Sequence, residues 1–285
     1  MIALTIWAWL SAGKLLGRLP MERRLSNFRN FAGELVPSPV RKSGDWIDAF
    51  PWAWDLLVEN GFVALLFTVG IACAAIILAS VLVLPFLPFA SRKLARRNPV
   101  GVWAGGKPNS IEQGSFTQPT LLDRFWRLAG GTTRFLFVLA RAVPEYILAF
   151  LLISLLGLQV WPLVLALAIH NFGILGRLWG EVVENSDDSA ARHAISSGMG
   201  RNQAFATSIF PEIFNRLLIY FFYRWETCVK DAAVLGMLGL LTLGHLIALE
   251  KGFFWDRMFF YVLLGAAVIM IGDLLSTWVR RALRG

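Results

Sequence analysis

The sequence predicts an all-α, polytopic membrane protein, a bundle of about five to six transmembrane helices. Three observations lead to this prediction. Apolar residues make up 56% of the 285 residues and charged residues only 16%, whereas soluble domains carry about a quarter charged residues. No charged residue occurs over residues 61–91, and ~20 apolar residues in helical form are enough to cross a bilayer core. Further long apolar runs follow toward the C-terminus, so the lipid bilayer is the first expected partner.

The charge balance and the cysteines exclude other classes. The formal net charge of +8 would suggest nucleic-acid binding in a soluble protein. In a membrane protein, however, basic residues flank the spans and set their orientation, so we expect no nucleic-acid partner. Cys73 and Cys228 both lie in apolar text, and the three histidines are far apart. We therefore expect neither a metal site nor a cofactor.

Residues 1–60 are predicted to form an N-terminal segment with a weak or truncated first span and an amphipathic lead-in. The opening apolar run ends at Ala12, because Lys14 and Arg18 follow, and this is short for a span. A signal-like region, a shallow first span and an interfacial helix all fit, and the sequence leaves them open. The Trp-rich text before residue 60 is typical of a membrane–water boundary.

Residues 61–285 are predicted to form the transmembrane domain. Five spans are expected, at residues 62–89, 135–156, 162–179, 213–231 and 258–279. Gly157, together with Trp161 and Pro162, divides one apolar run that is too long for a single span. The Gly-rich piece at residues 232–249 is expected to bend or re-enter at the outer face, which is tolerated where protein buries the backbone.

Basic residues predict the orientation of these spans. Eight Lys and Arg residues lie in the loop-like text at residues 91–134, and the positive-inside rule places that text in the cytoplasm. Counting spans forward puts residues 187–211 and the arginines after residue 279 in the cytoplasm as well. The basic residues between positions 23 and 42 would then lie outside, which disagrees with the rule.

The small, polar stretch at residues 187–211 carries helix punctuation. An Asp-Asp-Ser run can cap a short helix, and Gly198 and Gly200 can end it. Pro211 suits the first turn of the next helix, which re-enters the membrane. The sequence therefore predicts a compact helical knob at the inner face.

This stretch resembles the cytoplasmic motif of permease subunits of binding-protein-dependent ABC importers: Glu-Ala-Ala, three residues, Gly, nine residues, Ile, one residue, Leu-Pro. With Gly198 on the motif's glycine, Pro211 falls on its proline. Arg192, His193 and Ala194 then occupy the Glu-Ala-Ala positions, with an arginine where the motif has a glutamate. The resemblance implies that this stretch forms a coupling helix, which sits in a cleft of a separate ATP-binding subunit.

Three further stretches resemble the phosphonate-uptake permeases of that family. They are RAVPEYILAFLLISLLGL at 141–158, YRWETCVKDAAVLGMLG at 223–239 and GDLLSTWVRRALR at 272–284. The likeness is collinear from about residue 55 onward. It implies a type I, MetI-like importer fold in a bacterial inner membrane, and phosphonate, phosphate or phosphite as the solute. The implied partners are an ATP-binding subunit dimer, an extracytoplasmic solute-binding protein and a second permease subunit, identical or different.

Ionisable residues inside the predicted spans are candidate pathway residues, because a charge within the bilayer is a functional hypothesis by default. Arg141 and Glu145 are one helical turn apart, as are Glu226 and Lys230, so the members of each pair can meet. Either these pairs tie helices together, or, with Arg224, they line a path for an anionic solute.

Position within the spans refines this expectation. Pro144 is expected to kink its span, with the flanking charges near the cytoplasmic start. His170 and Asn171 are expected to bond to a neighbouring helix, and Gly173 and Gly176 to allow close helix packing.

Other functions are less compatible with the sequence. The text GVWAGGKP at 101–108 approaches a nucleotide-binding loop, but Pro108 replaces the hydroxyl residue that binds magnesium. ATP hydrolysis is therefore expected from another subunit, and no catalytic residue is predicted. We find no nucleophile–base motif of an intramembrane enzyme. A secondary transporter or a non-transporting scaffold is the alternative, although the internal repeats often seen in secondary transporters are not found.

Overall fold

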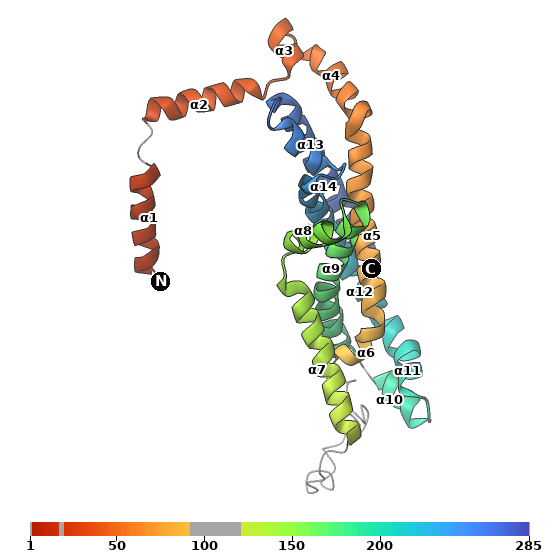
Figure 1. The fold of residues 1–285 in the computed structure, drawn as a ribbon. Coiled ribbons are helices and arrows are strands. Elements are labelled where there is room, and N and C mark those ends of the chain that lie inside the picture. Colours follow the sequence, from red (N-terminus) through yellow and green to blue (C-terminus); the bar gives the residue numbers. More distant parts are fainter. Residues whose placement is uncertain (1, 17–19, 92–120, 188, 285) are drawn as a thin grey trace.

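The structure is a computed structural model that describes residues 2–16, 20–91, 121–187 and 189–284. Every element of regular structure within these ranges is a helix (Figure 1). The text at 101–108 that approaches a nucleotide-binding loop lies outside the described residues, as does most of the basic stretch at 91–134.

The N-terminal segment is helical but stands apart from the bundle. It comprises α1 (Ile2–Leu16), α2 (Met21–Glu34) and α3 (Ser38–Ser43). In Figure 1, α1 lies beside the bundle rather than within it, and α2 crosses to the bundle at one end. All described side chains of α2 are exposed, and its apolar residues Met21, Leu25, Phe28 and Phe31 recur at spacings of three and four, with arginines between them. This pattern suits a helix that lies along a membrane surface.

The first long helix begins before the predicted span. Residues Trp46–Ala90 form one 45-residue helical stretch that is long and apolar enough to cross a membrane. It contains α4 (Ala49–Leu56), a π-helical turn (Leu57–Gly61), α5 (Phe62–Val83) and α6 (Leu87–Ala90). The helix therefore continues without interruption across residue 60, where the sequence suggested a boundary between two segments.

The rest of the chain supplies the remaining helices of the bundle. They are α7 (Leu121–Ala142), α8 (Glu145–Leu156), α9 (Val160–Glu184), α10 (Ser189–Ser196), α11 (Arg201–Ala204), α12 (Phe210–Leu235), α13 (Leu243–Glu250) and α14 (Trp255–Arg284). Within the described residues, three stretches can each cross a membrane as one helix: Trp46–Ala90, Val160–Glu184 and Trp255–Leu283. Two bent pairs, α7 with α8 and α12 with α13, raise the number of candidate spans to five. The helix Ile2–Ala12 is apolar but shorter than these candidates.

The core forms where α5, α9 and α12 meet. Small residues on these helices are fully buried, among them Ala72, Ala75, Ala166 and Ala232. They let the helices approach closely, which is how helices associate inside a bilayer.

The glycines of α9 act in the same way, as predicted. A Cβ at Gly173 would lie 2.6 Å from the carbonyl oxygen of Phe137, and one at Gly176 would lie 2.3 Å from the Phe137 ring. Helix α7 therefore packs on α9 at van der Waals distance only because these positions lack side chains.

The span predicted at residues 135–156 is wrong in two respects. Helix α7 already begins at Leu121, so part of the text interpreted as a loop is helical. The chain then breaks instead of kinking, because α7 and α8 meet at 84°. The physical cause is Pro144, which disfavours the helical conformation of Val143 before it. Pro144 itself is extended, with φ −57° and ψ 138°.

The Gly-rich piece after α12 is bent, as the sequence predicts. Helix α12 ends at Leu235, a single 3-10 turn follows, and α13 leaves at 44° to the helix before it. Gly239 has a φ of 110°, a conformation that residues other than glycine rarely adopt. The turn between the two helices therefore depends on a glycine at this position.

The two ends of the bundle carry different elements (Figure 1). Helices α6, α10 and α11 lie at one end, called the α10 end, and α3 and α13 lie at the opposite end, called the α3 end. By the charge distribution in the sequence, the α10 end is predicted to face the cytoplasm.

Candidate functional site: a coupling knob and an intramembrane polar network

The knob at residues 187–211 is built from three short helical pieces at the α10 end. Helix α10 begins at Ser189. The Asp187 carboxylate accepts hydrogen bonds from the Ser189 backbone N–H (3.0 Å) and hydroxyl (2.8 Å). The Asp187 backbone N–H in turn donates to Glu212 in the first turn of α12 (3.2 Å). These contacts fix the start of the knob to the start of the helix that follows it.

Gly198 ends α10 with a left-handed turn. Its φ is 93°, its N–H donates to the Ile195 carbonyl (3.0 Å), and the Met199 N–H donates to the Ala194 carbonyl (3.1 Å). This pair of bonds is the Schellman motif, which a glycine in the left-handed conformation favours. The turn reverses the chain so that α11 and a π-helical turn (Phe205–Ile209) lead into α12.

The motif residues divide between the inside and the outside of the knob. Ala191 is 5% exposed and joins the core with Ile209, whereas His193 and Pro211 are exposed. Pro211 stands in the first turn of α12, as predicted, where its missing N–H leaves no helical bond unmade. Arg192 and Ala194 are partly buried.

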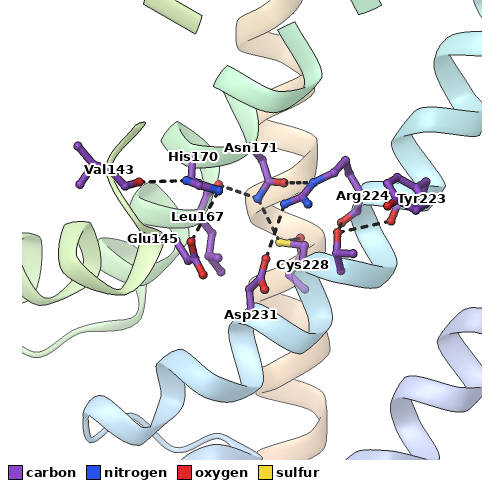
Figure 2. A network of polar contacts seen from close by, with 11 residues as sticks. Val143, Glu145, Leu167, His170, Asn171, Tyr223, Arg224, Cys228 and Asp231 are labelled. Carbon is purple, nitrogen blue, oxygen red and sulfur yellow. Dashed lines mark hydrogen bonds and ion pairs between the residues drawn. The ribbon is translucent and has the colours of Figure 1, made fainter. Parts of the chain in front are cut away.

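A polar network crosses the middle of the bundle (Figure 2). Arg224 on α12 donates from Nε to the Asn171 side-chain oxygen on α9 (2.9 Å), and its Nη2 lies 3.7 Å from Asp231. The Asn171 side-chain nitrogen donates to the Leu167 carbonyl (2.8 Å). A buried cation is tolerated in a bilayer when such partners surround it. Arg224 therefore joins two helices and neutralises a carboxylate, and only 12% of its side chain is exposed.

The same network reaches the break between α7 and α8. His170 on α9 places Nδ1 3.1 Å from the Val143 carbonyl and Nε2 3.6 Å from the Glu145 carboxylate. The Val143 carbonyl has no helical partner because Pro144 interrupts the helix. His170 therefore contacts one residue before the break, Val143, and one after it, Glu145. His170 and Asn171 do bond to neighbouring helices, as the sequence predicts.

The predicted pairing of Arg141 with Glu145 is wrong. The break separates the two residues, so the one-turn spacing that would bring them together in a helix is absent, and Glu145 contacts His170 instead. Among the described residues Arg141 forms no ion pair, and its Nε is buried without a hydrogen-bond partner. Arg141 also does not lie at the start of its span, because it stands near the far end of the 22-residue α7, roughly 30 Å from the first residue of that helix.

The second predicted pair is present. Lys230 donates to Glu226 at 2.7 Å, one turn apart on α12. Glu226 also lies 4.0 Å from Arg280 on α14, which is 3.9 Å from Asp273. Glu226 is largely buried, with 12% of its side chain exposed, whereas Lys230 is 43% exposed. Lys230 is therefore the member of this cluster that faces outward from the subunit.

A cavity of about 510 Å³ lies between α9, α12 and α14 toward the α10 end. Its polar lining includes Arg216, Tyr220 and Tyr223 on α12 and Arg280 on α14. Arg216 forms no ion pair within the described part of the chain. The α12 residues recur at spacings of three and four, so they share one face of the helix. Together with Lys230 they extend as a polar stripe along α12.

Sequence reasoning did not find three of these groups. In the sequence Arg280 belongs to the basic tail after residue 279, and nothing in the sequence singles out Asp231 as the partner of Arg224. The stripe on α12 could have been found from the helical spacing of Arg216, Tyr220 and Tyr223, because a polar face on a predicted span contradicts a lipid-facing position.

Comparison with known proteins identifies the fold and the family. Residues 122–285 match the family model described as the binding-protein-dependent transport system inner membrane component. The match covers more than half of the chain, including the knob and the network. The chain belongs to this family. The family is thus one of inner-membrane components of transport systems, and the described residues include three helices long and apolar enough to cross a membrane.

The curated relatives of this permease component are phosphorus-compound permeases. It is 29% identical to the phosphate-import permease protein PhnE of Mycolicibacterium smegmatis over 153 residues, 53% of this chain and 28% of that protein. It is 30% identical to the phosphite transport system permease protein PtxC of Stutzerimonas stutzeri over 112 residues, 39% of this chain and 41% of that protein. A putative cryptic phosphonate transport system permease protein of Escherichia coli is 28% identical over 118 residues, 41% of this chain and 97% of that protein. The chain thus spans well under half the length of the first two relatives.

Solved structures agree on the fold of the permease component. A crystal structure of an amino acid ABC transporter with histidines has a TM-score of 0.58 and 12% identity, over 84% of this chain and 98% of that chain. The inward-facing MetNI methionine ABC transporter has a TM-score of 0.56 and 16% identity, over 82% of this chain and 98% of that chain. The predicted MetI-like, all-α importer architecture is therefore confirmed.

Proposed function

We propose that this chain is the permease subunit of an ATP-driven importer for a phosphorus oxyanion: phosphonate, phosphate or phosphite. The names of the curated relatives support the solute class. The observation that carries the proposal is the knob at the α10 end, where Gly198 closes a Schellman motif at the position of the family's coupling glycine. The chain would work with an ATP-binding subunit dimer, a solute-binding protein and a second permease subunit, identical or different.

The knob would transmit ATPase closure to the bundle through α12. The π-helical turn Phe205–Ile209 runs directly into α12, so a movement of the knob moves the first turn of that helix. Helix α12 carries Arg224, Glu226 and Lys230 in its second half. A coupled change in access requires that ATPase contacts differ between two states of the bundle, and the knob is the surface where such contacts would form.

The polar stripe on α12 is the proposed lining of the solute path. Arg216 and Lys230 offer cationic groups toward its two ends, and the hydroxyls of Tyr220 and Tyr223 offer donors between them. Phosphonate and its relatives carry several acceptor oxygens, which arginine, lysine and hydroxyl donors match. In this arrangement Arg224 and Glu145 are ties between helices, and the stripe contacts the solute.

The substitution Gly198→Val tests the coupling role. Valine is strained by ~1–2 kcal/mol in the left-handed conformation, so the Schellman turn should open and α10 should be displaced. We expect ATP-binding subunit captured by the purified permease to fall about tenfold, measured by pull-down after co-expression. Gly200→Ala is the matched control, because a Cβ there meets only the Gln203 side chain, at 3.5 Å, and capture should be unchanged.

Uptake into proteoliposomes separates this proposal from its alternative. With ATP inside, the complex should accumulate phosphate, phosphite or methylphosphonate, and the Gly198→Val complex should not. If the purified chain alone accumulates solute when an ion gradient is imposed and no ATPase is present, it is a secondary transporter and the proposal fails. If ATPase capture is normal but none of the three solutes is accumulated, the coupling role stands and the solute class is wrong.

A further inference from the structure

Two adjoining hollows open on the side of the bundle formed by α6, α7 and α9. The first, here called the charged hollow, measures about 320 Å³ and is lined by charged residues near the α10 end, among them Arg134, Arg177, Glu181 and Glu184. The second, called the apolar hollow, measures about 430 Å³ and has an almost wholly apolar lining from α5, α7, α8 and α9.

Aromatic rings connect the two hollows. Phe137 lines the charged hollow, while Phe86 and Phe172 line the apolar one. The Phe137 ring centroid lies 5.0 Å from that of Phe172 and 6.4 Å from that of Phe86. The two hollows, here together called the groove, are therefore neighbours separated by packed aromatic rings, with the charged hollow toward the α10 end and the apolar hollow further along α7 and α9.

The charged hollow holds one cation and one anion that lack charge partners among the described residues. Arg177 and Glu181 neutralise each other at 3.0 Å. Arg134 has Nη1 buried without a hydrogen-bond partner, and within the described residues neither Arg134 nor Glu184 forms an ion pair. A buried guanidinium nitrogen with no acceptor is costly, so the described residues alone leave the groove incomplete.

We propose that this groove binds a phospholipid with a phosphoethanolamine headgroup, from the bilayer leaflet at the α10 end. The phosphate accepts hydrogen bonds from Arg134, and the primary ammonium donates to Glu184. One acyl chain occupies the apolar hollow. Basic pockets between transmembrane helices commonly hold lipid headgroups, and here the added carboxylate selects a headgroup that carries both charges. The lipid joins α7, which carries Arg134, to α9, which carries Glu184.

The charge pattern disfavours the other common headgroups. A phosphoglycerol headgroup supplies the phosphate but has no cation for Glu184. A phosphocholine headgroup has a cation without N–H groups, so it cannot donate to the carboxylate, and quaternary ammonium groups are recognised instead by aromatic faces.

Native mass spectrometry of the purified full-length chain tests the proposal. The chain is mixed with equal amounts of dioleoyl lipids carrying ethanolamine, choline or glycerol headgroups, and the retained lipid is identified from the mass of the protein–lipid complex. We expect ethanolamine lipid to be retained about fivefold over either competitor, because the contact between its ammonium and Glu184 should contribute ~1 kcal/mol, as a partly exposed ion pair does. Glu184→Gln should remove the preference, because only the ethanolamine ammonium donates to Glu184. Arg134→Gln should instead lower the retention of all three lipids, because each of them carries the phosphate. Arg124→Gln, the same change at an exposed position of α7, should leave both the preference and the retention intact.

Further arms keep the test decisive if the charge variants fold poorly. Leu139 is 52% exposed and lines the apolar hollow, so Leu139→Trp should reduce retention of all three lipids while both charges stay in place. Equal retention of the three lipids by the unmodified chain would overturn the proposal. So would a photoreactive group at Val138 that cross-links a second protein chain in the membrane and no lipid, because the groove would then be a subunit interface.

Discussion

Asn171 shows how a single side chain organises the interior of this permease component. It is fully buried, and its amide uses both ends: the oxygen accepts from Arg224, and the nitrogen donates to Leu167 and lies 3.6 Å from the Cys228 sulfur. A buried polar group is stabilising only when its partners are present. Asn171 and Arg224 therefore depend on each other, and the contact fixes α9 against α12.

Replacing Asn171 with leucine should destabilise the protein. Leucine is similar in size but cannot accept from the Arg224 guanidinium, which would keep only Asp231 as a partner. We expect a loss of about 2 kcal/mol, measured as reduced free energy of unfolding during SDS titration in mixed micelles. Asn215→Leu, at an exposed position on α12, should change the free energy of unfolding by less than ~0.5 kcal/mol. Equal effects of the two variants would mean that the Arg224 contact contributes nothing.

Residue pairs on one helix could be predicted from the sequence, and pairs on different helices could not. Glu226 and Lys230 are i, i+4 neighbours and meet as expected. Arg141 and Glu145 have the same spacing but are separated by the break at Pro144. The contact of Arg224 with Asn171 joins positions 53 residues apart, and its specificity arises from packing that a single sequence does not reveal.

At the scale of elements, the bend between α12 and α13 depends on the absence of a side chain. A Cβ at Gly244 would lie 1.8 Å from the Ala233 carbonyl oxygen and 3.0 Å from its carbonyl carbon. Both are backbone atoms, which cannot rotate away as a side chain can. The start of α13 therefore packs against the last turns of α12 only with glycine at this position.

The substitution Gly244→Ala should force these helices apart. We expect a destabilisation of about 3 kcal/mol, the upper end of the usual cost of overpacking, visible as a lower midpoint of thermal unfolding in detergent. Gly265→Ala on α14 is the control, because nothing lies within 4 Å of an added Cβ there. Alanine has a higher helix propensity than glycine, so the control variant should be more stable toward unfolding by about 0.5–1 kcal/mol. A Gly244 variant as stable as its control would show that α13 is free to move from α12.

The existence of most helices could be predicted, but not all of their limits. Long uncharged runs identify α5, α9 and α14 directly, because few soluble elements have this composition. The beginning of α7 was missed, since residues 121–134 carry enough charge to read as a loop. Its amphipathic pattern was the available signal. The bend before α13 could be predicted because three glycines interrupt the apolar text there.

At the scale of the whole molecule, the N-terminal segment joins the bundle at the α3 end. Asp256 at the start of α14 is 3% exposed, accepts a hydrogen bond from the Ser38 backbone N–H (2.9 Å), and lies 3.7 Å from Arg41. The Phe31 and Trp255 rings meet edge to face beside it, with centroids 5.5 Å apart. One carboxylate thus connects α3 to a helix more than 200 positions later in the chain.

Removing this carboxylate should release the segment. In Asp256→Ala, both polar contacts are lost, and hydrogen bonds to charged groups contribute roughly 1.5–3 kcal/mol. Trypsin cleavage after Arg41 and Lys42 should accelerate roughly tenfold or more, because cleavage follows local opening. Asp48→Ala, at an exposed position close by, should leave the cleavage rate unchanged. If the two variants are cut at the same rate, the aromatic contact alone anchors the segment.

The uninterrupted length of helix α12 has a consequence for how a movement at one face of the membrane reaches the other face. It is continuous over 26 residues, roughly 39 Å of uninterrupted backbone hydrogen bonding, and therefore behaves as a stiff rod. The two ends of a stiff rod cannot reorient independently, so a few degrees of tilt at Phe210 become several ångströms of sideways travel near Leu235. Mechanical stiffness, and not a chain of specific side-chain contacts, sets how far such a displacement reaches.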